Sequence, residues 1–335
     1  MKAPKYWEHG RGGLMSALLS PIGWLFGVGT QLNQSAATPI QAPAPVLCIG
    51  NAVAGGAGKT PIAIDIGKRL LSAGVNAHYL SRGYGGSEQG PHLVDPASDN
   101  VARVGDEPLL LAQIAPTWIS KDRVKGAIAM VEAGAKTILM DDGFQNPSLL
   151  KDINLCVIDG TYGIGNGRVM PAGPLREEFE HSLQKSNAIV IMGTDRAGMA
   201  ERIKAITPDI VLLKAQVTAK LTNFNILNQP IHAFSGIGHP DKFFNMLGEL
   251  GCDIIKATPF ADHHIYKDTE ISQLVEVAEA DKALLLTTEK DYVRLDRKWH
   301  IVVKPISISL TWENEPPLKT LLEPIIHIAS NTENH

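Results

Sequence analysis

The sequence predicts an α/β fold in which a mostly parallel sheet is covered by helices on both faces. Near-continuous apolar, strand-like runs alternate with helical patterns along most of the chain, which is typical of parallel strands buried on both sides. A second alternation of the same kind begins near Ile231. The length of 335 residues is enough for about two domains. We therefore expect a larger first domain and a second, smaller α/β/α domain.

Composition narrows the class of protein. Hydrophobic residues make up 44% and charged residues 20% of the chain, as in folded proteins, which excludes a disordered chain. The formal net charge of -4 gives no general basic excess, so we expect no nucleic acid among the partners. Cys48, Cys156 and Cys252 each lie in an apolar run, which favours buried thiols in a reducing compartment over a disulfide framework.

The chain begins with an apolar segment, and we assign residues 1–35 to an N-terminal membrane-associating segment that contains a helix. No charged residue occurs between Arg11 and Lys59, and the 15 residues 14–28 are mostly apolar. As a helix this run reaches only about 22 Å, short of the about 30 Å of a bilayer core. We therefore favour an interfacial helix with Trp7 and Trp24 at headgroup depth. A marginal spanning helix, a helix packed on the protein's own core and a cleaved signal peptide are the alternatives.

Elements of the two domains follow in order. A linker at 30–45 is too rich in proline and small residues for a helix. The first domain, expected at 36–225, has predicted strands at 46–50, 76–80, 117–120, 137–142, 154–159 and 188–193, and helices at 59–73, 106–114 and 122–133. Asp122 is the expected N-cap of the last helix. The second domain, expected at 226–325, has predicted strands at 231–236, 252–257, 283–288 and 301–308, and helices at 241–250 and 268–279, before a tail at 326–335.

The strongest chemical signal is a glycine-rich turn, CIGNAVAGGAGKTP, between a buried strand and a helix. Backbone N–H groups of such a turn and the helix N-terminus bind phosphate, which makes the first domain P-loop NTPase-like. The usual GxxxxGK[ST] pattern has glycine where Val53 stands, and Gly55 and Gly56 supply the flexibility instead. The expected nucleotide-binding residues are Val53, Ala54, Gly55, Gly56, Ala57, Gly58, Lys59 and Thr60.

A divalent metal site is expected next to this turn. Lys59 would reach the β- and γ-phosphates of a nucleotide, and the Thr60 hydroxyl would bind Mg²⁺. Asp141 and Asp142 end an apolar strand, and at least one of them is expected to hold the metal directly or through water. The alternative is that one aspartate only caps the following turn.

Two further clusters are candidates for the chemistry itself. Asp106 and Glu107 lie at a helix start, where favourable capping is the alternative role. Asp262, His263 and His264 follow a strand of the second domain, and without a third ligand at suitable spacing they make a poor zinc site. A carboxylate–imidazole pair contributed by two domains would suit removal of a proton from a sugar hydroxyl.

Basic residues near other strand ends complete the candidates. Arg82 follows a strand, at the sheet edge where ligands bind in such folds. The long irregular stretch 165–177 holds Arg176 and Glu177, and long loops in compact domains are often functional. The segment TTEKDYVRL at 287–295 also follows a strand. For each of these, turn formation or solvent exposure is the alternative.

Taken together, these segments resemble the tetraacyldisaccharide 4'-kinase family of lipid A biosynthesis. The resemblance covers nearly the whole chain, because the matching segments occur in the same order. They are YWEHGRGGLMSALLSPIGWLFG, IGNAVAGGAGKTP, LSRGYGG, GDEPLLLA, DDGFQ, GNGRVMPAGPLRE, FSGIGHPDKFF, FADHHIY and TTEKDYVRL. Asn146 departs from the family pattern, in which histidine usually follows DDGFQ, and the segment between the apolar start and Lys59 lacks the basic residues common there.

The resemblance implies a monomeric kinase that transfers the ATP γ-phosphate to the 4'-hydroxyl of tetraacyldisaccharide 1-phosphate, giving the 1,4'-bisphosphate (lipid IVA). It implies action at the cytoplasmic face of the inner membrane, with ATP and Mg²⁺ between two α/β/α domains. The implied residue roles are Asp106 as base assisted by His263, Asp141, Asp142 and Glu177 near Mg²⁺, and Arg82, Glu107 and Arg176 at the substrate. A P-loop ATPase or GTPase switch acting on a protein partner, and a secreted binding module, are the rival readings.

Overall fold

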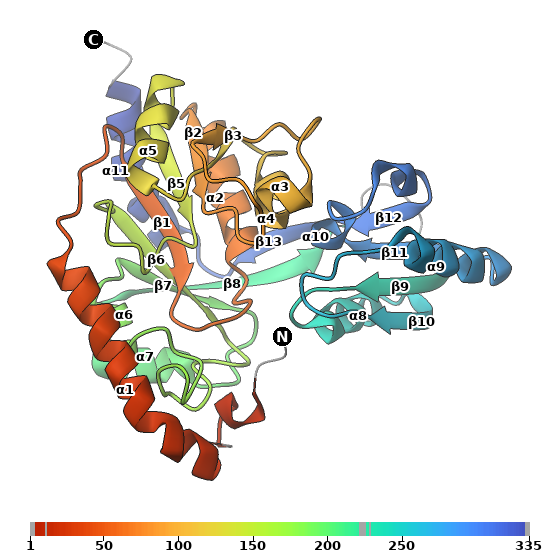
Figure 1. Cartoon of the computed structure of the whole chain (residues 1–335), viewed down its shortest axis with the longest axis horizontal. Coiled ribbons are helices and arrows are strands. Elements are labelled where there is room, and N and C mark those ends of the chain that lie inside the picture. The colour runs from red at the N-terminus through yellow and green to blue at the C-terminus, as the bar shows by residue number, and fades with distance from the viewer. Residues whose placement is uncertain (1–3, 11, 221–225, 228, 332–335) are drawn as a thin grey trace.

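The computed structural model describes residues 4–10, 12–220, 226–227 and 229–331, with the side chains of 330 and 331 left aside. Two sheets form two domains that lie side by side, with a long N-terminal helix along the first (Figure 1). This arrangement confirms the predicted α/β fold with a smaller second α/β domain. The three cysteines are free and buried, as expected.

The first domain is built on a nine-stranded sheet of order β13-β8-β7-β6-β1-β5-β2-β4-β3. Its strands are β1 (Val46–Asn51), β2 (Ala77–Ser81), β3 (His92–Leu93), β4 (Thr117–Ile119), β5 (Thr137–Asp141), β6 (Ile153–Asp159), β7 (Ala188–Met192), β8 (Val211–Ala219) and β13 (Ile308–Trp312). The strands from β8 to β4 are parallel, and β13 and β3 add antiparallel edges. The carboxyl ends of the parallel strands therefore meet at one edge, where ligands bind in open α/β sheets.

Both faces of this sheet are covered by helices. Leu47 and Ile49 of β1 belong to the apolar cluster on one face, and Val46 and Cys48 to the cluster on the other. The first cluster includes α2 (Lys59–Ser72) and α11 (Pro316–Asn331), and the second includes α5 (Arg123–Glu132), α6 (Phe179–Gln184) and α7 (Met199–Ile206). The Asp122 carboxylate accepts from the backbone N–H groups at the start of α5, which confirms the predicted N-cap.

The second domain has a parallel sheet of order β10-β9-β11-β12. Its elements are β9 (Pro230–Ser235), α8 (Pro240–Glu249), β10 (Asp253–Pro259), α9 (Asp268–Ala280), β11 (Leu284–Thr288), α10 (Glu289–Tyr292), the 3-10 helix η2 (Arg297–Ile301) and β12 (Val303–Ile306). Separate apolar clusters form around Ile231 and around Phe234, which lie three positions apart and face opposite sides of β9.

The C-terminal part of the chain returns to the first domain, which corrects the boundaries expected at 226–325 and 326–335. The run 301–308 is not one strand, because β12 ends at Ile306 in one sheet and β13 starts at Ile308 in the other. β13 pairs with β8, and Leu318 and Leu322 of α11 pack into the first domain's core. The apolar pattern is continuous across the crossing point, so the sequence alone gives no sign of it.

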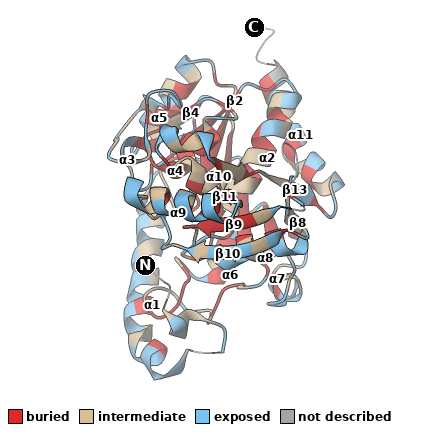
Figure 2. Cartoon of the chain, turned by 90° about the vertical axis from the view of Figure 1, so that its right-hand side faces the viewer, coloured by how far each residue is buried: buried red, intermediate tan, exposed pale blue. Residues whose placement is uncertain are grey.

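The N-terminal helix α1 (Gly13–Ala36) is longer than expected. Its last seven positions were predicted to begin the 30–45 linker, and that prediction is wrong. At about 1.5 Å per residue, the 24-residue helix is about 36 Å long, so length no longer excludes a membrane span. Ser16 and Gly23 are its buried residues, and most of its surface is exposed (Figure 2). This exposure disfavours the alternative of a helix packed on the protein's own core.

Candidate active site

The glycine-rich turn connects the end of β1 to the start of α2, as predicted. Gly55 and Gly58 have φ angles of +119° and +85°, which explains why glycine stands at these two positions. Val53 needs no such freedom, because it is buried and pairs with Leu175 in an antiparallel bridge. The departure from the usual motif therefore leaves the geometry of the turn intact.

One predicted phosphate donor is already engaged. The backbone N–H of Ala54 donates to the carbonyl oxygen of Pro174 at 2.8 Å. Val53 and Ala54 therefore form a wall of the turn, and the N–H groups of Gly55 to Thr60 have no carbonyl acceptor outside their own helix in the described part of the chain. These later amides are the ones available to an anion.

Lys59 is held at the mouth of the turn by two polar side chains. Its Nζ atom donates to Oδ1 of Asn51 at 3.1 Å and lies 3.5 Å from Oδ1 of Asp142. The Asn51 amide also donates to the carbonyl oxygens of Val53 (2.7 Å) and Gly55 (3.1 Å), which fixes the shape of the loop. Asn51 closes the buried strand, and sequence reasoning missed it although a polar residue at a buried strand end was a usable signal.

The two aspartates at the end of β5 have different environments. Asp142 forms ion pairs with Lys59 and Arg176 (3.1 Å), and these cations lower its pKa although burial acts to raise it. Asp141 is buried, and burial with the charges of Glu107 and Asp142 raises its pKa to about 7. Its Oδ1 atom has no hydrogen-bond partner among the described residues. A buried carboxylate oxygen without a partner suits a hard divalent cation.

Glu177, expected near the metal, is engaged elsewhere. Its carboxylate is 3% exposed and accepts from Nζ of Lys185 at 2.6 and 2.8 Å. Gln34 of α1 and Gln145 donate to it at 3.5 and 3.4 Å. Among the described residues, no three His, Cys, Asp or Glu side chains form a metal-binding group. This geometry argues against a metal-ligand role for Glu177 and instead links α1 to the loop after β5.

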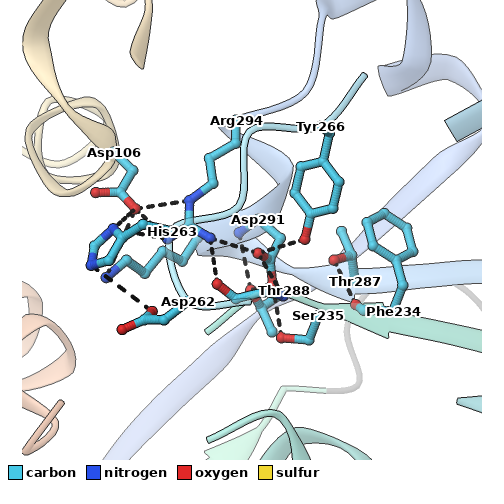
Figure 3. A network of polar contacts seen from close by, with 12 residues as sticks. Asp106, Phe234, Ser235, Asp262, His263, Tyr266, Thr287, Thr288, Asp291 and Arg294 are labelled. Carbon is cyan, nitrogen blue, oxygen red and sulfur yellow. Dashed lines mark hydrogen bonds and ion pairs between the residues drawn. The ribbon is translucent and has the colours of Figure 1, made fainter. Parts of the chain in front are cut away.

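Asp106 and His263 meet across the two domains (Figure 3). Asp106 begins α4 (Asp106–Leu111) of the first domain, and His263 lies in the loop after β10 with a φ angle of +55°. The Nδ1 atom of His263 lies 3.1 Å from Oδ2 of Asp106. The predicted interdomain carboxylate–imidazole pair is therefore present.

Asp106 is a strongly held carboxylate. It is 2% exposed, and its oxygens accept from the backbone N–H of Glu107 (3.0 Å) and from Nε of Arg294 (2.8 Å). Burial acts to raise its pKa, but the hydrogen bond from His263 and the charges of Lys290 and Arg294 outweigh burial and lower the pKa well below its usual value. The carboxylate consequently stays ionised at physiological pH.

The other candidates occupy the rim of this site. Glu107 accepts from Nζ of Lys290 at 2.6 Å, so it too joins the domains. Arg176 donates to Asp142 and Gln145. Arg82 is exposed at the end of β2. His264 differs from its neighbour, because it pairs with Glu270 (2.9 Å) and packs against the rings of Phe260 and Tyr266 inside the second domain.

Sequence reasoning singled out the segment 287–295 but gave its residues no role. Lys290 and Arg294 are four positions apart and both reach the first domain. Lys290 lies in α10 (Glu289–Tyr292), and Arg294 lies just beyond the C-cap of this helix. A spacing of four along one helical turn places two side chains on one face, and this was the signal available for them.

Comparisons with known proteins agree with this geometry. Residues 15–327 match the family model described as LpxK, tetraacyldisaccharide-1-P 4'-kinase. The chain belongs to this family. It is 45% identical over 325 residues to the tetraacyldisaccharide 4'-kinase of Paramagnetospirillum magneticum, covering 97% of this chain and 99% of that one. It is 44% identical to that of Rhodospirillum centenum, covering 97% of each chain.

A solved structure is similar over nearly the same length. The crystal structure of LpxK from Aquifex aeolicus in complex with ATP superposes with a TM-score of 0.73 at 25% identity, covering 93% of this chain and 100% of that chain. As a member of the tetraacyldisaccharide 4'-kinase family, the chain is a kinase. The rival readings of a switch protein and of a secreted binding module are not favoured by this membership.

One departure from the family pattern has a structural role here. Oδ1 of Asn146 accepts from the backbone N–H (3.1 Å) and the hydroxyl (2.7 Å) of Ser148. The Asn146 carbonyl oxygen in turn accepts from Nζ of Lys151 at 2.7 Å. Asn146 therefore shapes the turn after β5 and has no contact with the Asp106–His263 pair.

Proposed function

We propose that this protein transfers the γ-phosphate of ATP to the 4'-hydroxyl of a tetraacyldisaccharide 1-phosphate and so forms the 1,4'-bisphosphate. Family membership supports the reaction. The observation that carries the proposal is the Asp106–His263 pair between the domains, at the same sheet edge as the glycine-rich turn. A kinase needs both parts: a phosphate site and a group that accepts the proton of the attacking hydroxyl.

The geometry favours His263, and not Asp106, as the proton acceptor. A carboxylate with a strongly lowered pKa is a weak base, and both Asp106 oxygens already accept hydrogen bonds. If Nδ1 carried no proton, its lone pair would face the negatively charged carboxylate and be repelled by it. The imidazole proton therefore belongs on Nδ1, and Nε2 is left as the acceptor. The His263 side chain is 37% exposed, with Nε2 3.9 Å from Asp262. We therefore revise the expected roles: Asp106 orients the ring, and His263 takes the proton.

The proposed reaction is a single displacement at the γ-phosphorus of ATP. The proton of the 4'-hydroxyl passes to Nε2 of His263 as the 4'-oxygen forms a bond to the γ-phosphorus. The bond from that phosphorus to the β,γ-bridging oxygen breaks, and ADP leaves. The Asp106 carboxylate stabilises the imidazolium while it carries the proton. Backbone N–H groups of the turn and the Lys59 ammonium hold the phosphates in line.

Asp141, Asp142 and Thr60 are the residues that would hold Mg²⁺. The unpartnered Oδ1 atom of Asp141 and the neighbouring carboxylate of Asp142 fit a hard cation. Bound Mg²⁺ neutralises the negative charge that develops on the phosphates. Arg82, Glu107 and Arg176 stay proposed substrate contacts at the rim.

The outer face of α1 supports action on a lipid. Large apolar side chains that are 53–77% exposed recur every three or four residues, at Leu14, Leu18, Ile22 and Leu25. The opposite face is made of small and polar residues that are buried or half-buried. These residues are Ser16, Ser20, Gly23, Gly27, Thr30 and Gln34. This pattern inverts that of a helix on a water-soluble protein and favours membrane contact.

The docking contacts support a helix that lies flat on the membrane. The Ser16 hydroxyl donates to the Ala172 carbonyl at 2.7 Å, and Gln34 accepts from Nζ of Lys185 at 3.1 Å. These contacts are 18 residues, or about 27 Å, apart on α1. A span would place the charged partners Glu177 and Lys185 in hydrocarbon, which is costly. The first of the two tryptophans is not free for headgroups, since Trp7 donates to the Pro171 carbonyl at 3.1 Å.

We further propose that the protein works as a monomer at the cytoplasmic face of the inner membrane, where ATP and reducing conditions meet its needs. Binding to anionic lipid vesicles tests the membrane contact. The double variant Leu18→Asp/Leu25→Asp should stay in the supernatant when vesicles are pelleted. Ile301→Asp, which changes an even more exposed apolar residue of the second domain, should pellet as wild type does. Equal vesicle binding by all three proteins would contradict a role for α1.

Label transfer tests the reaction itself. Incubation with γ-labelled ATP, Mg²⁺ and a monophosphorylated lipid A precursor in detergent should place the label on the 4'-oxygen. Lys59→Met, which removes the phosphate-binding ammonium, is the negative control. Hydrolysis of ATP that ignores the lipid and needs a protein partner would instead support the switch reading.

A further inference from the structure

The Asp106–His263 pair has a third member that the reaction scheme leaves without a role. Arg294 lies in the second domain, three residues after Asp291, and its side chain is 2% exposed. Its Nε atom donates to Oδ2 of Asp106 at 2.8 Å, and a second guanidinium N–H reaches the same oxygen. Figure 3 shows Arg294 between Asp106 of the first domain and Asp291 of the second.

The side of the guanidinium that faces away from Asp106 is also held by hydrogen bonds. One Nη atom of Arg294 donates to Oδ1 of Asp291 at 2.8 Å and to the carbonyl oxygen of Gly236 at 2.7 Å. Asp291 is itself fully buried and accepts from the hydroxyls of Ser235 (2.9 Å) and Tyr266 (2.9 Å). A planar guanidinium held on two sides has little freedom to turn, so its N–H groups stay directed at the first domain.

We propose that Arg294 is a positioning residue that keeps Asp106 ionised and directed at His263 once the two domains meet. The proposal rests on the proposed kinase function. A buried carboxylate needs a permanent cation, and only arginine supplies one that does not deprotonate. Because Arg294 and His263 both belong to the second domain, their docking brings the counter-charge and the imidazole to Asp106 in one step.

Other charged and aromatic groups also face the Asp106–His263 pair. Nζ of Lys290 lies 3.8 Å from Oδ2 of Asp106 but makes its closer contact with Glu107 at 2.6 Å. Asp262 lies 3.9 Å from Nε2 of His263, and the Tyr84 ring centroid lies 5.7 Å from that of the imidazole. Lys290 alone cannot replace Arg294, since its ammonium is shared with Glu107 and makes no short contact with Asp106.

The test compares two arginines that both join the domains. Arg297 donates to the carbonyl oxygens of Pro96 and Ala97 across the domain boundary but touches neither Asp106 nor His263. We would measure kcat and KM against pH for Arg294→Met, Arg294→Lys and the control Arg297→Met. Removing a positive charge beside the pair raises its affinity for protons, so the acidic limb of the kcat profile of Arg294→Met should move up by about one pH unit.

The expected result has three parts. Arg294→Met shows the shifted limb and a kcat lowered about 10–100-fold at pH 7, within the usual contribution of a positioned proton acceptor, with ATP affinity unchanged. Arg294→Lys keeps the wild-type acidic limb but has a lower kcat, because an ammonium has three N–H donors where the guanidinium has five and cannot reproduce all the contacts with Asp106, Asp291 and Gly236. Arg297→Met keeps the acidic limb and the kcat of the wild-type protein.

Two outcomes would overturn the proposal. One is a uniform loss of kcat in Arg294→Met at every pH, which would make the residue a simple interdomain contact. The other is an Arg294→Lys protein with wild-type kcat; this variant decides the matter if Arg294→Met fails to fold. Wild-type protein that transfers no label to the lipid at any pH would contradict the proposed function instead, so the two failures are distinguishable.

Discussion

His263 Nδ1 lies 3.1 Å from Asp106 Oδ2, although the two residues are 157 positions apart and belong to different domains. Neither domain alone contains the pair. The glycine-rich turn and the aspartates proposed to bind Mg²⁺ belong to the first domain, whereas the imidazole belongs to the second. The proposed proton acceptor is therefore paired with Asp106 only when the two domains are in contact.

Replacing Asp106 tests the orienting role. In Asp106→Asn the amide N–H would face Nδ1 and move the imidazole proton to Nε2, the atom that must accept a proton. We expect kcat to fall by about 10²–10⁴-fold, with ATP affinity nearly unchanged. Steady-state kinetics and calorimetric ATP titration measure the two quantities. A parallel collapse of ATP affinity would show that Asp106 is a metal or structural residue.

Replacing Asp141 should raise the stability of the metal-free protein and remove its activity. Its folded-state pKa of about 7 lies above its ordinary value of 3.8, so its contribution to stability is fully present below about pH 4 and is lost as the pH rises through 7. Without metal, Asp141→Asn should therefore raise the free energy of unfolding by about 1–3 kcal/mol at pH 8, and by less at pH 5.

The measurement is urea unfolding in chelator at both pH values. Activity with Mg²⁺ should be lost in the same variant, because the proposed metal ligand is gone. A variant that is less stable than wild type at pH 8 would contradict the unpartnered, partly protonated state of Asp141. Retained activity would remove Asp141 from the metal site.

Asn51 should control ATP affinity through the shape of the loop. Asn51→Ala removes hydrogen bonds to Val53, Gly55 and Lys59. We expect ATP binding to weaken by about tenfold, since a net loss of about 1.4 kcal/mol corresponds to that factor. Asn76→Ala is the matched control, because its amide donates to the Gly134 carbonyl on the exposed far side. Equal ATP affinity in the two variants would disprove the role.

Two glycines of α1 give a test of its docking. A methyl group at Gly23 would lie 2.7 Å from the Val169 carbonyl oxygen, whereas at Gly29 it would meet nothing within 4 Å. We expect Gly29→Ala to gain up to about 1 kcal/mol from helix propensity. Gly23→Ala should lose about 1–3 kcal/mol through the clash. Thermal unfolding of the two variants measures this difference. Equal melting temperatures would mean that α1 is not docked at this loop.

Local patterns were the predictable part of this structure. The Asp122 cap, the buried strands and the turn before Lys59 depend on neighbours within a few residues, so sequence periodicity and spacing reveal them. Asp106 and His263 were also found, from their places at a helix start and after a strand, and the family resemblance added their implied roles.

Long-range pairings were the part that sequence could not supply. Nothing near Arg294 indicates a partner 188 positions away, and nothing near Ser307 marks the passage between sheets. The helix α1 exceeded its predicted end because Thr30 and Gln34 satisfy their polar groups on the Phe26 carbonyl and on Lys185. The composition of that stretch suggested a linker because its partners were not visible.

The rate at which γ-label appears on the 4'-oxygen, measured in His263→Ala with and without added imidazole, tests the central claim most directly. If His263 is the proton acceptor, imidazole should restore transfer, and the restored rate should follow the free-base fraction of imidazole as pH changes. No restoration in His263→Ala, together with restoration of Asp106→Ala by acetate or formate, would contradict the account and make Asp106 the base.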